Sequence, residues 1–67
     1  MSSLIRKLRE EEKLSITKLA QRAGVNPSAL CWAELGKVAP GKAFRASLAA
    51  FYGKPEEMLF HPSGFAK

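Results

Sequence analysis

Apolar residues recur along the chain at spacings of three and four positions, with polar residues between them, which is typical of amphipathic helices. Glycine and proline interrupt this pattern at short intervals, so each helix is short. The sequence therefore predicts an all-α fold with helices over about 4–13, 16–23, 27–35 and 42–52 and from 55 to about 60. We expect a single domain over residues 1–67, with its core in 4–60 and with 61–67 as a C-terminal tail, of which 65–67 form a loose end or a contact arm.

Helical spacing also predicts which side chains are buried. In the helix over 27–35, Leu30 and Ala33 fall on the inner side. At the end of the last helix, Met58, Leu59 and Phe60 are expected to cover the core.

The clearest local signals lie at the boundaries of the second and third predicted helices. Ser15 is a suitable N-cap for the second, because its hydroxyl can accept from free backbone N–H groups. Gly24 can end that helix in the positive-φ conformation that a sharp turn requires. Asn26 is a preferred N-cap residue and Pro27 fits the first helical position, so the third helix begins there.

Two short helices joined by a glycine-containing turn form a helix-turn-helix, which we expect between Ser15 and Gly36. In this motif the first helix braces the DNA backbone, and the second lays its amino-terminal residues into the major groove. Small helical bundles also use such turns, so the pattern alone is weakly specific.

The formal net charge of +5 favours an acidic partner such as nucleic acid. No acidic residue lies between Lys37 and Lys54, so Lys37, Lys42 and Arg45 form a purely positive stretch. The alternative interpretation is a soluble basic protein with scattered, solvated lysines.

Several functional classes lack support in the sequence. The single cysteine, Cys31, cannot form an internal disulfide, and no CxxC pair or histidine cluster indicates a metal site. No paired carboxylates, glycine-rich phosphate loop or nucleophile–base pair indicate an enzyme or a cofactor. No apolar run reaches the roughly 18–20 residues of a membrane span, and no signal peptide is evident. We expect a cytoplasmic protein that is not an enzyme.

A longer pattern is more specific than the helix-turn-helix alone. The following segments succeed one another at characteristic distances: Leu8-Arg9-Glu10-Glu11, Leu14-Ser15, Leu19-Ala20, Ala23-Gly24-Val25, Glu34-Leu35-Gly36-Lys37, Pro40, Leu48-Ala49 and Met58-Leu59-Phe60. Over about residues 4–60 the chain resembles the phage-repressor and Cro-like family, also called the xenobiotic-response-element family. The resemblance implies a compact five-helix, lambda-repressor-like domain that binds double-stranded operator DNA as a homodimer.

The resemblance also implies roles for individual residues. Arg9 and Glu34 match positions of a partly buried ion pair, the alternative being two independent surface charges. The candidates for phosphate contacts are Ser15, Lys18, Lys37, Lys42 and Arg45. The candidates for base contacts are Asn26, Pro27, Ser28, Cys31 and Trp32.

Two departures from the family pattern leave the target open. Ile16 stands where the family commonly has a phosphate-binding Gln, and no Arg, Lys, Asn or Gln follows Asn26 in the third helix. Thymine methyl contacts and readout of DNA shape remain possible. Alternatively, Cys31, Trp32 and Leu35 form an exposed apolar surface for a protein partner. A further alternative is that Trp32 leans over the loop after the third helix and belongs to the core.

Overall fold

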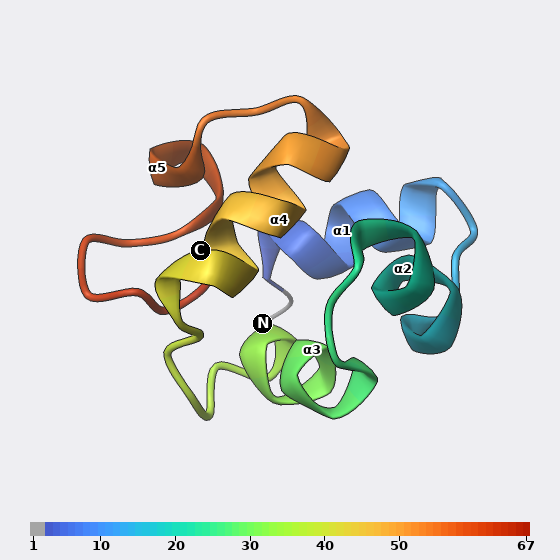
Figure 1. Ribbon diagram of the computed structural model, residues 1–67, viewed down its shortest axis with the longest axis horizontal. Helices are drawn as coiled ribbons and strands as arrows, with labels where there is room; N and C mark the ends of the chain where they lie inside the picture. Colours follow the sequence, from blue (N-terminus) through green and yellow to red (C-terminus); the bar gives the residue numbers. More distant parts are fainter. Residues whose placement is uncertain (1–2) are drawn as a thin grey trace.

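The computed structural model describes residues 3–67, which form five helices and no strand. Figure 1 shows them in chain order: α1 (Leu4–Glu11), α2 (Ile16–Ala23), α3 (Pro27–Glu34), α4 (Lys42–Tyr52) and α5 (Glu56–Leu59). The predicted all-α fold with five helices is confirmed, and α2 and α4 have the predicted bounds. Within residues 3–67, no helix has the length and apolar composition needed to cross a membrane.

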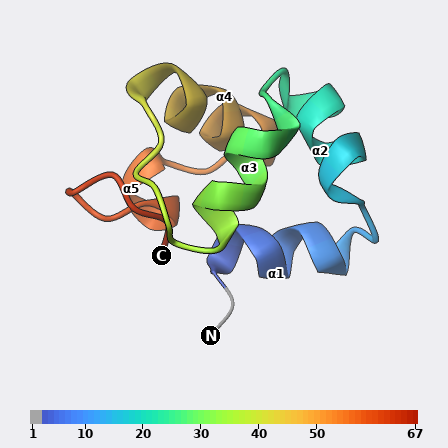
Figure 2. The same cartoon turned by 90° about the horizontal axis from the view of Figure 1, so that it is seen from below.

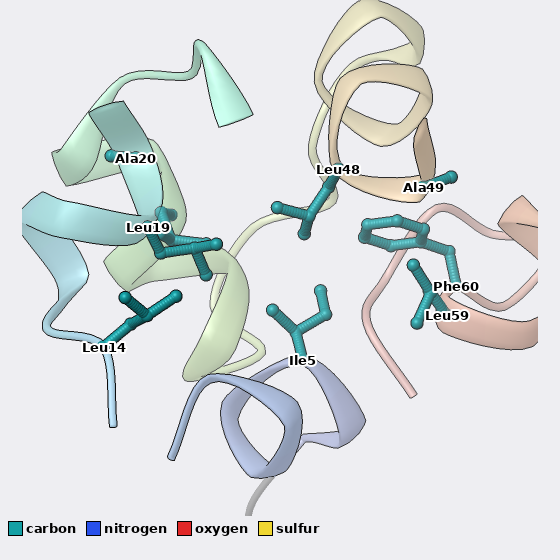
Figure 3. Close-up of a cluster of buried hydrophobic side chains, with 9 residues drawn as sticks. Ile5, Leu14, Leu19, Ala20, Leu48, Ala49, Leu59 and Phe60 are labelled. Atoms are coloured by element: carbon teal, nitrogen blue, oxygen red, sulfur yellow. The ribbon is translucent and has the colours of Figure 1, made fainter. Parts of the chain in front are cut away.

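Every helix contributes one large, fully buried aliphatic side chain to a single core, namely Ile5, Leu19, Leu30, Leu48 and Leu59. In Figure 3, Ile5 of α1 and Leu48 of α4 point toward one another. Around this centre α2 packs against α3 and α4, and α4 packs against α5. The small core thus depends on all five helices at once.

The last helix differs in one respect from the sequence prediction. Leu59 and Phe60 are buried as predicted, but Met58 is 48% exposed. Successive residues of a helix point about 100° apart, so with Leu59 in the core its neighbour Met58 faces solvent.

Side-chain caps begin the first three helices. Ser3 Oγ accepts from the backbone N–H of Arg6 at 3.2 Å, and Ser15 Oγ accepts from that of Lys18 at 3.1 Å. Asn26 Oδ1 accepts from two backbone N–H groups of α3, at 2.8 and 3.2 Å. These bonds satisfy donors that a helix cannot satisfy internally, so the predicted starts of α2 and α3 are confirmed.

The ends of α1 to α4 share one closing turn, in which a left-handed residue lets the next backbone N–H donate to a carbonyl five positions earlier. At the end of α2 the left-handed residue is Gly24, with φ +73°. At the end of α1 it is Lys13, with φ +57°, and the Leu14 N–H donates to the Arg9 carbonyl at 3.1 Å. Lys13 is the one non-glycine residue with positive φ within residues 3–67.

Residues 65–67 fold back onto the domain, so the prediction that they form a loose end is wrong. Phe60 and Ala66 form an isolated antiparallel bridge, and the Lys67 N–H donates to the Leu59 carbonyl at 2.9 Å. The Leu4 N–H at the start of α1 donates to the Lys67 carbonyl. All of these are backbone bonds, which leave no side-chain pattern in the sequence.

The turn of this C-terminal segment also contacts the loop after α3. Gly64 has φ +98°, and a Cβ at this position would lie 3.1 Å from Arg45 Nη1 and 3.3 Å from Ala39 Cβ. A side chain there would require both a strained backbone and displaced neighbours. The C-terminal segment is therefore packed against the loop that joins α3 to α4.

We predict that Lys13→Gly stabilises the domain. Glycine removes the strain of a left-handed lysine, a gain that exceeds the added entropy of the unfolded chain. The expected increase in the free energy of unfolding is about 0.5–1 kcal/mol in urea denaturation. The control is Lys7→Gly within α1, which should lower this free energy by about 1 kcal/mol. A loss of stability in Lys13→Gly would show that the lysine side chain contributes more than its backbone strain costs.

Candidate nucleic-acid interface

The outer surface of α3 is open to solvent. Figure 2 views the molecule onto this helix, with α1, α2 and α4 arranged around it. Leu30 and Ala33 are fully buried beneath it. The side chains on its opposite side are exposed, and we call Pro27, Ser28, Cys31 and Trp32 the outer face of α3. The predicted inner and outer sides of this helix are confirmed.

An ion pair fixes the end of α3 against α1. Arg9 Nε donates to Glu34 Oε2 at 2.8 Å, and Arg9 Nη2 donates to Glu34 Oε1 at 3.1 Å. Arg9 Nη1 also donates to the Leu14 carbonyl at 2.8 Å. The side chains of Arg9 and Glu34 are only 14% and 4% exposed. The hydrogen bonds to Glu34 raise the pKa of the Arg9 guanidinium further, so the paired state is the charged one.

Two of the predicted contact residues also shape the motif itself. The oxygens of Ser15 and Asn26 accept the capping hydrogen bonds of α2 and α3, while both residues remain exposed. The hydroxyl hydrogen of Ser15 and the two amide hydrogens of Asn26 are not used by these caps, so they can donate to an external acceptor. Each residue can therefore cap its helix and contact a ligand at the same time.

The predicted phosphate-binding cations fall into two groups. Lys18, Lys37 and Lys42 are exposed. Arg45 is engaged within the domain: its Nη1 donates to the Pro40 carbonyl at 2.8 Å, and its Nε lies 3.6 Å from Glu56 Oε1. Arg45 thus holds the α3–α4 loop against α5, and the three lysines remain the freer candidates for phosphate.

The middle of the chain presents positive charge without a competing free carboxylate. Between Lys13 and Pro55 the only acidic residue is Glu34, and Arg9 neutralises it inside the domain. Our list of phosphate candidates omitted Arg22, which is exposed in the last turn of α2. The sequence could have indicated Arg22, because it lies in the span between Lys13 and Pro55, where Glu34 is the only acidic residue.

Trp32 lies on the surface, so the interpretation that it belongs to the core is wrong. Its side chain is 47% exposed, and the ammonium of Lys37 lies 5.5 Å from its ring centroid. Leu35 is 53% exposed and Val38 is 44% exposed. We call Cys31, Trp32, Leu35 and Val38 the apolar stripe. Val38 was not among the predicted residues, since it follows the helix and carries no periodic signal.

Tyr52 lies near the Arg9–Glu34 pair and is electrostatically affected by it. Burial of its hydroxyl, with repulsion from Glu12 and Glu34, raises the pKa of Tyr52 to about 12. The hydroxyl has no hydrogen-bond partner within residues 3–67. A buried polar group without a partner lowers stability.

We predict that Glu34→Ala strongly destabilises the domain, because it leaves the Arg9 guanidinium unpaired in a largely buried position. The expected loss is about 3–5 kcal/mol of the free energy of unfolding. The control is Glu10→Ala, which removes a 3.9 Å surface pair with Arg6 whose side chains are 44% and 56% exposed. That variant should change stability by less than about 1 kcal/mol. Equal effects in urea denaturation would show that the buried pair is no stronger than the surface pair.

We predict that Tyr52→Phe raises the free energy of unfolding by about 1 kcal/mol at pH 7, because it removes an unpartnered buried hydroxyl. The natural chain should also lose stability between pH 10 and 12. There the unfolded tyrosine, with its pKa near 10, ionises while the folded one with the raised pKa stays protonated. Denaturation of both proteins across this range gives the measurement, and the Tyr52→Phe profile shows the pH dependence that does not come from this hydroxyl. Parallel pH profiles would contradict the assignment.

Comparison with known proteins agrees with this geometry. The family model of the helix-turn-helix domain matches residues 1–60. Comparisons with curated proteins and with solved structures give no significant match. The matched part includes α2, the turn at Gly24 and α3, so the chain belongs to the helix-turn-helix domain family.

Proposed function

We propose that this domain is a DNA-binding transcriptional regulator of the phage-repressor and Cro type, acting in the cytoplasm as a homodimer and not as an enzyme. The observation that carries the proposal is the exposed outer face of α3 within a helix-turn-helix whose surroundings are cationic. In this proposal α3 enters the major groove of double-stranded DNA, and α2 lies across the backbone.

Phosphate contacts provide most of the affinity in this proposal. Lys18 lies in the first turn of α2, and Lys37 and Lys42 flank the loop between α3 and α4. Cations at these places bind the backbone on either side of a groove that α3 occupies. Ile16 makes no polar contact, so the start of α2 depends on Ser15, Lys18 and its backbone N–H groups.

The short length of α3 supports the proposed homodimer, as does the family resemblance. One helix of eight residues reads only a few base pairs. Two copies related by a two-fold axis would contact half-sites about one helical turn apart, roughly 34–36 Å. Such an arrangement lengthens the recognised sequence and doubles the phosphate contacts.

A second candidate function is a protein-interaction module that uses Cys31, Trp32 and Leu35. The specific observation in its favour is the exposure of Trp32 and Leu35, at 47% and 53%. Aromatic residues of this kind often dominate binding energy at protein interfaces. Sedimentation of the natural chain and of the Trp32→Ala variant distinguishes the two candidate functions. If the domain is a protein-interaction module, the natural chain associates with a protein partner or with itself, Trp32→Ala abolishes this association, and DNA does not change it.

We predict that the chain binds duplex DNA at low salt and that log K falls linearly with log salt concentration. Lys37→Ala and Lys42→Ala should each lower the steepness of this dependence by about 0.9, the value for one lost phosphate contact. The matched control is Lys7→Ala, an exposed lysine of α1 near Glu10 and Glu11, which should leave the dependence unchanged. A mobility-shift titration at several salt concentrations measures all of these. Absence of binding at the lowest salt would refute the proposal.

A further inference from the structure

The outer face of α3 contains few hydrogen-bonding side chains, although cations lie beside it. Of its four residues, only Ser28 has a hydroxyl, and Trp32 adds a single indole N–H. The apolar stripe continues this surface through Leu35 and Val38. Paired hydrogen bonds to base edges require Arg, Lys, Asn or Gln, and α3 contains none of these.

The major groove offers one apolar group to such a surface. Guanine, adenine and cytosine present hydrogen-bonding atoms there, whereas thymine also presents its C5-methyl group. An apolar side chain gains free energy by covering this methyl, and it gains nothing comparable from cytosine, which has hydrogen at the same position.

Charge complementarity identifies nucleic acid as the occupant of this surface. The Lys37 ammonium lies 5.5 Å from the Trp32 ring centroid, so a phosphate-binding cation and an apolar contact surface are adjacent. Lys18 and Lys42 are exposed on the neighbouring elements, and the carboxylate of Glu34 is buried and paired. This combination fits duplex DNA, a polyanion whose thymine methyl groups lie in the groove between its two phosphate backbones.

Lys37 also affects how Trp32 is held. A cation over one face of an indole is attracted to that face and restricts the ring. Restriction lowers the entropy lost when the ring contacts a ligand. Trp32 is therefore better suited to a defined contact than a freely rotating side chain would be.

We propose that Cys31 and Trp32 determine the sequence specificity of this domain by contacting thymine C5-methyl groups in the major groove. This inference rests on the proposed DNA-binding function and assigns its recognition chemistry. Ser28, one turn before Trp32 on the same side, supplies at most one directional hydrogen bond to an adjacent base.

The test begins with duplexes selected from a random pool by the full chain. Each thymine of the selected sequence is then replaced singly by deoxyuridine, which removes the methyl and keeps every hydrogen-bonding group. Loss of one buried methyl contact corresponds to roughly fourfold weaker binding. We expect this loss at one or two thymines of each half-site and little change elsewhere.

Variants of the protein test whether Trp32 is the side chain that contacts the thymine methyl group. In Trp32→Ala the deoxyuridine penalty should disappear at one position, while binding at low salt persists. The matched control is Phe65→Ala, which removes another exposed aromatic side chain, 40% exposed in the C-terminal segment, and should keep the full penalty. Thermal unfolding of both variants verifies that they fold, and the deoxyuridine series on the natural chain needs no variant.

The possible failures are distinct. Tight binding to selected duplexes without any deoxyuridine effect would overturn the methyl contact and leave the DNA-binding function intact. Absence of duplex binding at low salt would overturn both. Self-association that depends on Trp32, without duplex binding, would assign this surface to a protein partner instead.

Discussion

The bidentate bond between Arg9 and Glu34 is the interaction on which the arrangement of this domain depends. It joins α1 to the end of α3, and the third donor of Arg9 holds the Leu14 carbonyl between α1 and α2. One guanidinium therefore fixes three segments. Because each helix contributes only one large, fully buried aliphatic side chain to the core, a directional bond of this kind adds to apolar packing in setting the position of α3.

The same pair shapes the electrostatics of the surface. Glu34 is the only carboxylate between Lys13 and Pro55, and its burial against Arg9 removes it from the exposed side of the domain. The remaining acidic residues lie near the ends of the chain, in Glu10–Glu12 and Glu56–Glu57. The exposed residues of α2, α3 and the following loop thus include cations and apolar side chains and no free carboxylate, a suitable composition for a nucleic-acid contact.

The second support of α3 comes from the other end of the chain. Arg45 bonds to Pro40 and lies near Glu56, and Gly64 packs against Arg45 and Ala39. The Pro40 end of the loop after α3 is therefore held by α4, α5 and the C-terminal segment. At the exposed start of the same loop, the ammonium of Lys37 lies over the Trp32 ring, beside the apolar stripe.

The helices, their caps at Ser15 and Asn26, and the inner side of α3 could be predicted from the sequence, because these features depend on neighbours two to four residues away. The sequence also indicated the pairing of Arg9 with Glu34 through family resemblance. Only the tertiary structure decided that Trp32 is exposed, that Met58 faces solvent, that Arg45 is engaged internally, and that residues 61–67 are docked. These features depend on how loops and helix ends pack against the core, and often on backbone atoms, so they leave no periodic pattern of side chains in the sequence.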